Sequence, residues 1–370
     1  MSFKKAALGT TLTVLATASF SALAYDVNEM SWGEIEAQAK KEGNITFAVW
    51  YLQPQWREFV KDFEQDTGIK VRIPEGTHDG NRNKLMAESR RDKGSIDVLA
   101  IGPTSIDVIN KESTLLPLEK LPEFKQLTTR AEGVESEGYA VTFWGNQTGL
   151  AYDPMRVDEA TLPQSFEEME AFISNNPMAF GVNDPNGGGA GLRFIESTIR
   201  HVSGDAEQGE KVDRKIIKSW STAWDWFQNN KEDMLITASN ADSLTRINDG
   251  EITIAPAWED HLAALQQQGA ITDRIKFYIP EFGMSGGGNF VTVPSNGQKK
   301  AASLVFINWL TSADTQAALN KTFGIAPQHP EADSSNALIP TEMRALATEP
   351  FNADYAAELK KQFTRNVLMR

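Results

Sequence analysis

One stretch, residues 43–73, constrains the fold more than any other part of this chain. Residues 45–50 are rich in β-branched and aromatic side chains and predict a short buried strand. Apolar residues then recur at helical spacing over residues 56–63, and Gly68 ends that helix before a second predicted strand, residues 69–73. Such a strand, helix and strand cross over right-handed into a parallel sheet. The sequence therefore predicts an α/β fold.

Further predicted strands divide the chain into two lobes. Two segments interrupt the predicted strands: Trp-Gly-Asn-Gln within residues 143–148, and a glycine-rich stretch within residues 278–289. We interpret both as crossings between lobes. Lobe 1 is expected to comprise residues 25–144 and 285–370, and lobe 2 residues 145–284. This division is based on strands predicted over residues 96–101, 139–143, 148–152, 252–255, 277–279 and 289–293.

The first 24 residues have the pattern of a secretory signal peptide. Lys4 and Lys5 precede an uncharged run, and Ala22-Leu23-Ala24 fits the small-residue cleavage pattern. The run is too short, and too rich in Thr, Ser and Ala, to span a bilayer well. We therefore predict removal of residues 1–24 and a periplasmic location.

Composition restricts the class of partner. The net charge of −14 becomes −16 without residues 1–24, which disfavours nucleic acid and anionic lipid as partners. The chain contains no cysteine, so no thiol can carry a lipid anchor, and its four histidines show no metal-binding spacing. We expect a monomer without cofactor or metal that binds a small molecule.

Ligands of open α/β sheets sit beyond the carboxyl ends of the strands. Trp50 and Tyr51 end the first predicted strand, and Trp258, Glu259 and Asp260 follow a later one. Aromatic faces and carboxylates favour a cationic amine, although core packing and a solvated helix start would also explain these residues. The full predicted ligand set is Trp50, Tyr51, His78, Thr104, Ser105, Trp144, Asn146, Gly189, Arg193, Trp258, Glu259 and Asp260.

Two alternatives remain open. The glycines of 187–191, together with Arg193, could hold a phosphorylated or phosphonate compound at a helix start, although a surface loop is the commoner explanation. Gly-Met-Ser-Gly-Gly at 283–287 fits the G-x-S-x-G elbow of a serine hydrolase using Ser285, with His329 downstream. That elbow requires a helix directly after the serine, whereas a strand is predicted here. We therefore expect no enzyme.

Four segments carry a resemblance to a known family. Gly43-Asn44-Ile45-Thr46 with residues 63–71, Asp97-Val98-Leu99, residues 149–153, and residues 300–310 with Gln316 follow one another in the family's order. On these segments the chain resembles the extracellular solute-binding proteins of ATP-binding-cassette (ABC) importers, near the branch of polyamine-, thiamine- and ferric-iron-binding members.

The resemblance implies a type 2 periplasmic binding protein fold, with two α/β lobes joined by a two-strand hinge. It also implies capture of a small polar nutrient by hinge closure and delivery to a membrane permease and its ATPase, or a sensor role on the same fold. Iron-binding members use adjacent tyrosines, and no two of the six tyrosines here are adjacent. The expected ligand is a thiamine- or polyamine-like cation.

Overall fold

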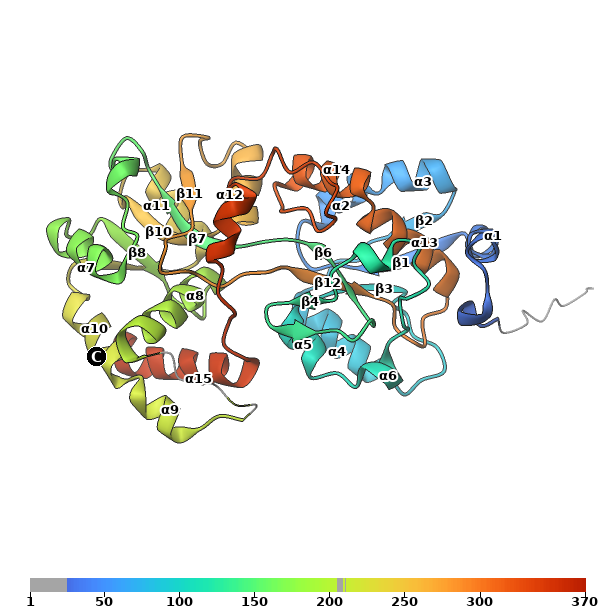
Figure 1. The fold of residues 1–370 in the computed structure, drawn as a ribbon, viewed down its shortest axis with the longest axis horizontal. Coiled ribbons are helices and arrows are strands. Elements are labelled where there is room, and N and C mark those ends of the chain that lie inside the picture. The colour runs from blue at the N-terminus through green and yellow to red at the C-terminus, as the bar shows by residue number, and fades with distance from the viewer. Residues whose placement is uncertain (1–24, 205–208, 210) are drawn as a thin grey trace, which may run out of the picture.

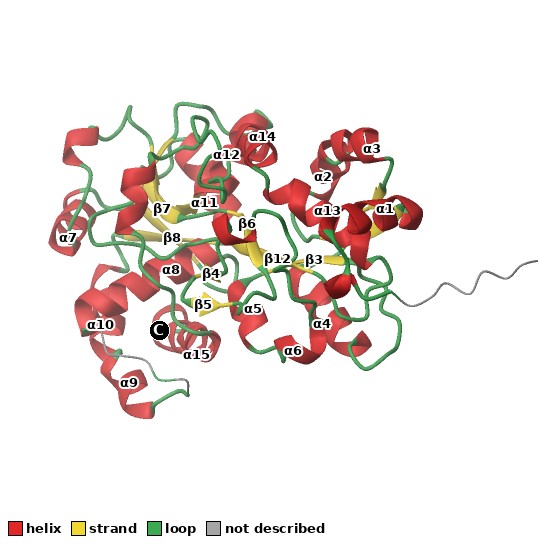
Figure 2. Ribbon diagram, turned by 45° about the vertical axis from the view of Figure 1, so that its right-hand side comes forward, coloured by secondary structure: helices red, strands yellow, loops and turns green. Residues whose placement is uncertain are grey.

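The protein consists of two α/β lobes that lie side by side (Figure 1). The computed structural model describes residues 25–204, 209 and 211–370, so the predicted signal peptide lies outside the described residues. Each lobe contains a five-stranded sheet with helices packed around it (Figure 2). No helix within the described ranges is long and apolar enough to cross a membrane.

The sheet of lobe 1 has the order β2-β1-β3-β12-β6. β1 pairs in parallel with β2 and β3, which confirms the predicted strand-helix-strand crossover. β12 enters from late in the chain and pairs antiparallel with both β3 and β6. The strands are β1 (Asn44–Ala48), β2 (Lys70–Arg72), β3 (Val98–Ile101), β6 (Val141–Trp144) and β12 (Asn289–Thr292).

The helix predicted over residues 56–63 is present as two consecutive helices, α2 (Gln53–Phe59) and α3 (Lys61–Thr67). Its apolar stripe is buried as expected, since Trp56 and Phe63 are at most 1% exposed. Gly68 ends α3 with a φ of 75°, a left-handed conformation that glycine adopts without steric cost. The other helices of lobe 1 are α1 (Trp32–Glu42), α4 (His78–Glu88), α5 (Pro103–Asp107), α6 (Lys111–Thr114), α13 (Lys300–Thr311) and α14 (Ala313–Phe323).

The sheet of lobe 2 has the order β11-β7-β10-β8-β9. One of its strands, β8, is not among the strands predicted from the sequence. It is buried throughout and pairs in parallel on both sides. The strands are β7 (Thr148–Tyr152), β8 (Phe180–Asn183), β9 (Met234–Thr237), β10 (Ile254–Trp258) and β11 (Lys276–Tyr278). The helices are α7 (Phe166–Asn175), α8 (Gly189–Thr198), α9 (Arg214–Ser219), α10 (Ser221–Asn230), α11 (Asn240–Asn248), α12 (Glu259–Gln267) and α15 (Ala353–Phe363).

The last helix corrects the expected assignment of residues 285–370 to lobe 1. Tyr355, Leu359 and Phe363 of α15 are buried in one apolar cluster with Trp220 and Phe227 of lobe 2. Figure 1 shows α15 against lobe 2. The sequence could not reveal this, because an amphipathic helix does not specify which apolar surface it covers.

Within the described residues the chain crosses between the lobes three times, whereas the sequence suggested two crossings. The first crossing joins β6 to β7, the second joins β11 to β12, and the third connects α14 to α15. Gly145 and Ala326 exchange backbone hydrogen bonds of 3.1 and 3.0 Å between the first and third crossings. Thr348 N donates to Met284 O at 3.2 Å between the third and second. The three segments are therefore hydrogen-bonded to one another at the junction of the lobes.

Candidate functional site

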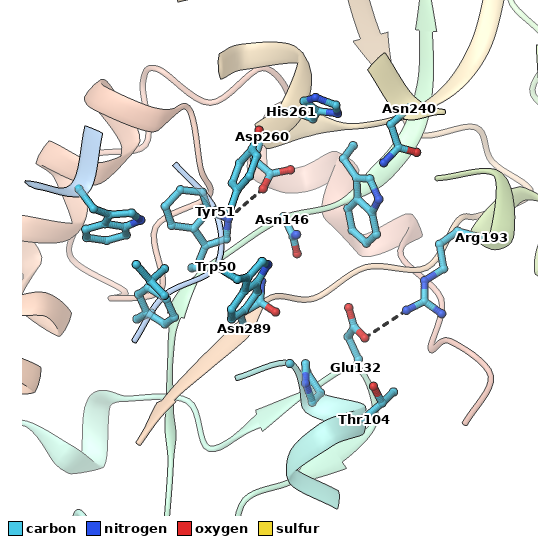
Figure 3. A pocket seen from close by; sticks show the side chains of 17 residues that line it. Trp50, Tyr51, Thr104, Glu132, Asn146, Arg193, Asn240, Asp260, His261 and Asn289 are labelled. Carbon is cyan, nitrogen blue, oxygen red and sulfur yellow. Dashed lines mark hydrogen bonds and ion pairs between the residues drawn. The ribbon is translucent and has the colours of Figure 1, made fainter. Parts of the chain in front are cut away.

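A cavity of about 390 Å³ lies between the lobes, at the carboxyl ends of β1, β3 and β10. Figure 3 shows its side chains converging from both lobes and from the first crossing. The lining residues are Val49, Trp50, Tyr51, Trp56, Gly102, Pro103, Thr104, Glu132, Phe143, Trp144, Asn146, Arg193, Asn240, Trp258, Asp260, His261 and Asn289.

The wall from lobe 1 is built at the end of β1. Leu52, with a φ of 56°, turns the chain sharply into α2, and Trp50 and Tyr51 lie just before this turn. The Trp50 ring lies 4.8 Å from the His78 ring, edge to face. His78 Nε2 accepts a hydrogen bond from Gly102 N at 3.2 Å, which requires an unprotonated Nε2. Burial lowers the pKa of His78, in keeping with this neutral form.

The wall from lobe 2 is built where β10 ends and α12 begins. Asp260 is 7% exposed, and its Oδ2 accepts a hydrogen bond of 2.9 Å from Trp144 Nε1. Burial raises the pKa of Asp260, and hydrogen bonds from Trp144, Asn146 and the His261 backbone partly oppose that rise. Burial also lowers the pKa of His261. Asp260 forms no ion pair with Lys or Arg in the described part of the chain, and the adjacent His261 is the titratable group whose charge lowers its pKa.

Arg193 is the only Lys or Arg among the described residues lining the cavity, and it is already paired. Its guanidinium lies 3.3 Å from Glu132 Oε2, across the cleft, and 2.9 Å from Glu196 Oε1. Figure 3 shows Glu132 and Arg193 facing each other. Two carboxylates share one guanidinium, so this cluster has no positive charge in excess.

Most of the predicted ligand residues are brought together here. Eight of the twelve line the cavity: Trp50, Tyr51, Thr104, Trp144, Asn146, Arg193, Trp258 and Asp260. The other four lie behind it. His78 backs Trp50, and Ser105 is buried with its Oγ 3.4 Å from His78 Nε2. A Cβ on Gly189 would lie 3.0 Å from Trp258 Nε1, so Gly189 backs that indole.

Glu259 does not line the cavity and instead forms a buried ion pair. It is fully buried, and both of its oxygens accept hydrogen bonds from Arg344, at 2.9 and 2.6 Å. Arg344 belongs to the third crossing, so this ion pair attaches that segment to α12. Sequence reasoning selected Glu259 by its position next to Asp260, but neighbouring residues at a helix start point in different directions.

Several lining residues were not predicted. Asn240 caps α8 from the adjacent α11, since its Oδ1 accepts from Ala190 N at 3.2 Å. Glu132 is at the turn between β4 (Arg130–Ala131) and β5 (Val134–Glu135), with a φ of 48°. His261 follows Asp260 directly, so the strand-end rule that found Asp260 could have included it. Val49, Trp56, Gly102, Pro103, Phe143 and Asn289 were also missed.

The structure gives no support to the two alternative sites. Ser285 is fully buried, its Oγ donates to Glu196 Oε2 at 3.1 Å, and the chain continues into β12 instead of a helix. The first turn of α8 is covered by Asn240, and Arg193 is held by two carboxylates. Within the described residues, no group of three or more His, Cys, Asp or Glu is placed to hold a metal ion.

Comparison with known proteins identifies the architecture. Residues 58–344 match the family described as bacterial extracellular solute-binding protein. A protein of Sinorhizobium fredii named "Probable ABC transporter periplasmic-binding protein" is 23% identical over 277 residues, which cover 74% of this chain and 72% of that protein.

Two solved structures share the fold. Iron-bound HitA from Pseudomonas aeruginosa superposes with a TM-score of 0.65 at 18% identity, covering 86% of this chain and 98% of that one. The spermidine/putrescine ABC transporter substrate-binding protein PotD from Streptococcus pneumoniae superposes with a TM-score of 0.67 at 12% identity, covering 88% and 98%. The predicted two-lobed periplasmic binding fold is confirmed.

Proposed function

This chain belongs to the family of bacterial extracellular solute-binding proteins, and on that premise we propose that it captures a small nitrogen-containing cation for an ABC importer. The ligand would be an amine of polyamine or thiamine type. Capture would occur outside the cytoplasm, after removal of residues 1–24, with delivery to a membrane permease and its ATPase. We propose no covalent chemistry.

One observation carries the choice of a cation: Asp260 is a buried carboxylate on the cavity wall without a Lys or Arg partner among the described residues. An isolated buried charge is costly unless an opposite charge compensates it. A ligand cation would supply that charge. The surrounding indole and phenol rings favour the same ligand, since a cation over an aromatic face gains about 0.5–2 kcal/mol.

An anionic ligand has weaker support. Arg193, whose guanidinium is the one that the described residues place at the cavity, already faces two carboxylates, so a phosphate would have to displace Glu132 from it. The acidic side chains of the wall, Glu132 and Asp260, would also repel it. The phosphorylated or phosphonate ligand therefore ranks below the cation.

Closure of the lobes would complete the site. Tyr51 of lobe 1 and His261 of lobe 2 lie with ring centroids 6.2 Å apart, and the Glu132–Arg193 pair spans the cleft elsewhere on the cavity wall. A ligand held by both walls makes more contacts when the lobes are shut than when they are apart. It therefore stabilises the shut form by that difference in contacts and no more.

The experiment is a thermal-shift screen against cations, phosphorylated compounds and neutral sugars, followed by calorimetry on any ligand found. A ligand at a hundredfold excess over its Kd adds about 2.7 kcal/mol to stability. We expect only cations to raise the Tm. Asp260→Asn should weaken binding about 30-fold or more, because it removes a desolvated charge partner.

Asp273→Asn is the matched control, since it removes an exposed carboxylate from the same lobe. It should bind like wild type. A screen in which only phosphorylated compounds raise the Tm, or an Asp260→Asn variant with wild-type affinity for every cation found, would refute the proposal.

A further inference from the structure

Trp144 lines the cavity, but nearly all of its surface is covered by protein. It is the last residue of β6 and is 5% exposed. Its ring packs against Trp56 and Phe323, with centroids 5.7 and 5.3 Å away, and Tyr51 lies edge to face with it at 6.4 Å. A cation–π contact requires a free ring face. The faces of this indole are therefore used for packing, and little of them remains for a ligand.

The indole N–H of Trp144 has a partner in the other lobe. Its Nε1 donates to Asp260 Oδ2 at 2.9 Å, and Figure 3 marks this hydrogen bond with a dashed line at Asp260. The bond joins the end of β6 in lobe 1 to the start of α12 in lobe 2. An indole N–H can only donate, and an ionised carboxylate can only accept. The bond therefore fixes one oxygen of Asp260 and favours its charged form.

The charged form of Asp260 is the form that a ligand cation requires. Asp260 is 7% exposed, and burial by itself favours the neutral carboxylic acid. The hydrogen bond from Trp144 opposes this effect without bringing a positive charge that would compete with the ligand. Loss of a hydrogen bond to a charged group corresponds to about a 10- to 100-fold change in an equilibrium constant. The N–H of Trp144 is thus large enough in its effect to decide whether Asp260 binds a cation.

We infer that Trp144 is a positioning residue for cation binding: its N–H keeps Asp260 oriented and ionised at the cavity wall, and its ring does not stack on the ligand. This inference rests on the proposed function, because it assumes that Asp260 pairs with a ligand cation. It separates the role of Trp144 from that of an aromatic side chain that contacts the cation with its ring face.

This role predicts a change in the pH dependence of binding. Cation affinity should fall as the pH falls through the pKa of Asp260, because protonation removes the negative charge. Burial raises that pKa and the hydrogen bond from Trp144 opposes the rise, so loss of the donor should move the fall in affinity to higher pH. The other titratable groups that interact with Asp260 stay the same when Trp144 alone is changed: Tyr51, His261, and Glu259 with its partner Arg344.

The test measures binding of n-butylammonium to wild type and to Trp144→Phe by calorimetry between pH 4.5 and pH 8. Phenylalanine keeps an aromatic ring but has no N–H. At pH 7 the variant should bind about 10-fold or more weakly, and its affinity should fall at a higher pH than that of wild type. Trp309→Phe is the matched control, because Trp309 packs on Phe59 and Phe63 and does not line the cavity. It should leave both quantities unchanged.

Two further measurements distinguish this role from a general effect on packing. In the Asp260→Asn background, Trp144→Phe should change the affinity by less than about threefold, because the group through which Trp144 acts is gone. The Trp144 indole N–H signal, assigned among the nine tryptophans by NMR, should move in Asp260→Asn, whose amide is neutral. This signal needs neither a Trp144 variant nor a ligand, so it tests the bond even where Trp144→Phe does not fold.

The outcomes separate the two proposals. Wild-type affinity and pH dependence in Trp144→Phe would overturn the role of Trp144 and leave the cation proposal standing. The same conclusion would follow if Trp144→Phe weakened binding equally in wild type and in Asp260→Asn, or if the Trp144 N–H signal did not move. Failure of wild type to bind n-butylammonium or any other cation, with binding of a phosphorylated compound instead, would overturn both.

Discussion

The stability of this protein should fall as the pH rises through neutrality, because of Glu42. This residue ends α1, and its Oε2 accepts a hydrogen bond of 2.7 Å from Ala302 N in the first turn of α13. Its Oε1 is buried without a hydrogen-bond partner in the described structure. Burial raises the pKa of Glu42 from its ordinary value of 4.5 to about 7, and the backbone hydrogen bonds from Ala302 and Ala301 only partly oppose that rise.

The sign and size follow from proton linkage. Between pH 4.5 and pH 7 the folded protein holds the Glu42 proton more tightly than the unfolded chain, so raising the pH favours unfolding. At about 1.4 kcal/mol per pKa unit, this group lowers the free energy of unfolding by roughly 3 kcal/mol between pH 4.5 and pH 8. Glu42→Gln removes the titration while keeping an acceptor for Ala302 N.

The assay is urea unfolding of wild type and Glu42→Gln at half-unit steps of pH. The difference between their free energies of unfolding should change by about 3 kcal/mol across the range. If the Glu42→Gln substitution itself changes stability by a pH-independent amount, that amount is the same at every pH and does not affect the change with pH. Glu36→Gln, an exposed change on the same helix, should give a curve parallel to wild type. A difference between wild type and Glu42→Gln that stays constant with pH would refute the reasoning.

Three further predictions concern packing and charge burial, each measured by urea unfolding. Arg344→Met should destabilise by about 3–5 kcal/mol, since it leaves the fully buried Glu259 unpaired, whereas Met at the exposed Arg365 should change little. Phe306→Ala should cost about 3–5 kcal/mol, because that ring packs at 5.2 Å on Phe47 and 5.1 Å on Phe63, and a loss below 1 kcal/mol would contradict it. Gly149→Ala should destabilise by about 1–3 kcal/mol, because its Cβ would come 2.3 Å from Tyr278 O. A Cβ at Gly33 on α1 would meet open space, so Gly33→Ala should instead raise the free energy of unfolding by up to about 1 kcal/mol, since Ala favours a helix more than Gly does.

Local patterns in the sequence predicted much of the framework. The opening strand-helix-strand unit depends on neighbouring residues along the chain, and its apolar stripe is buried as predicted. The strand-end rule also placed Trp50, Tyr51, Trp258 and Asp260 at one cavity. These predictions succeeded because periodicity and sheet geometry determine them within a few residues.

Features that depend on distant partners were not predictable in this way. β8 was not predicted as a strand because it contains Gly181 and Asn183 and, being buried on both faces, shows no alternation of apolar and polar residues. Glu259 and Asp260 look equivalent in sequence, yet one meets Arg344 and the other faces the cavity. Glu132 reaches the site from a short hairpin turn without any strand-end signal. Each outcome is decided by a side-chain contact more than 60 residues away in the sequence, or by strand pairing that hydrophobic periodicity does not reveal.

The late segments of the chain also decide when either lobe can finish folding. β12 occupies an interior position in the first sheet, and residues from Phe351 to Val367 fill the apolar centre of the second. Until these late segments are synthesised, both lobes therefore remain incomplete, with unpaired sheet edges and exposed apolar surface. Long-range closure of this kind makes folding slow and aggregation-prone until the last residues arrive. Truncation before α15 should accordingly leave lobe 2 unable to reach its native packing.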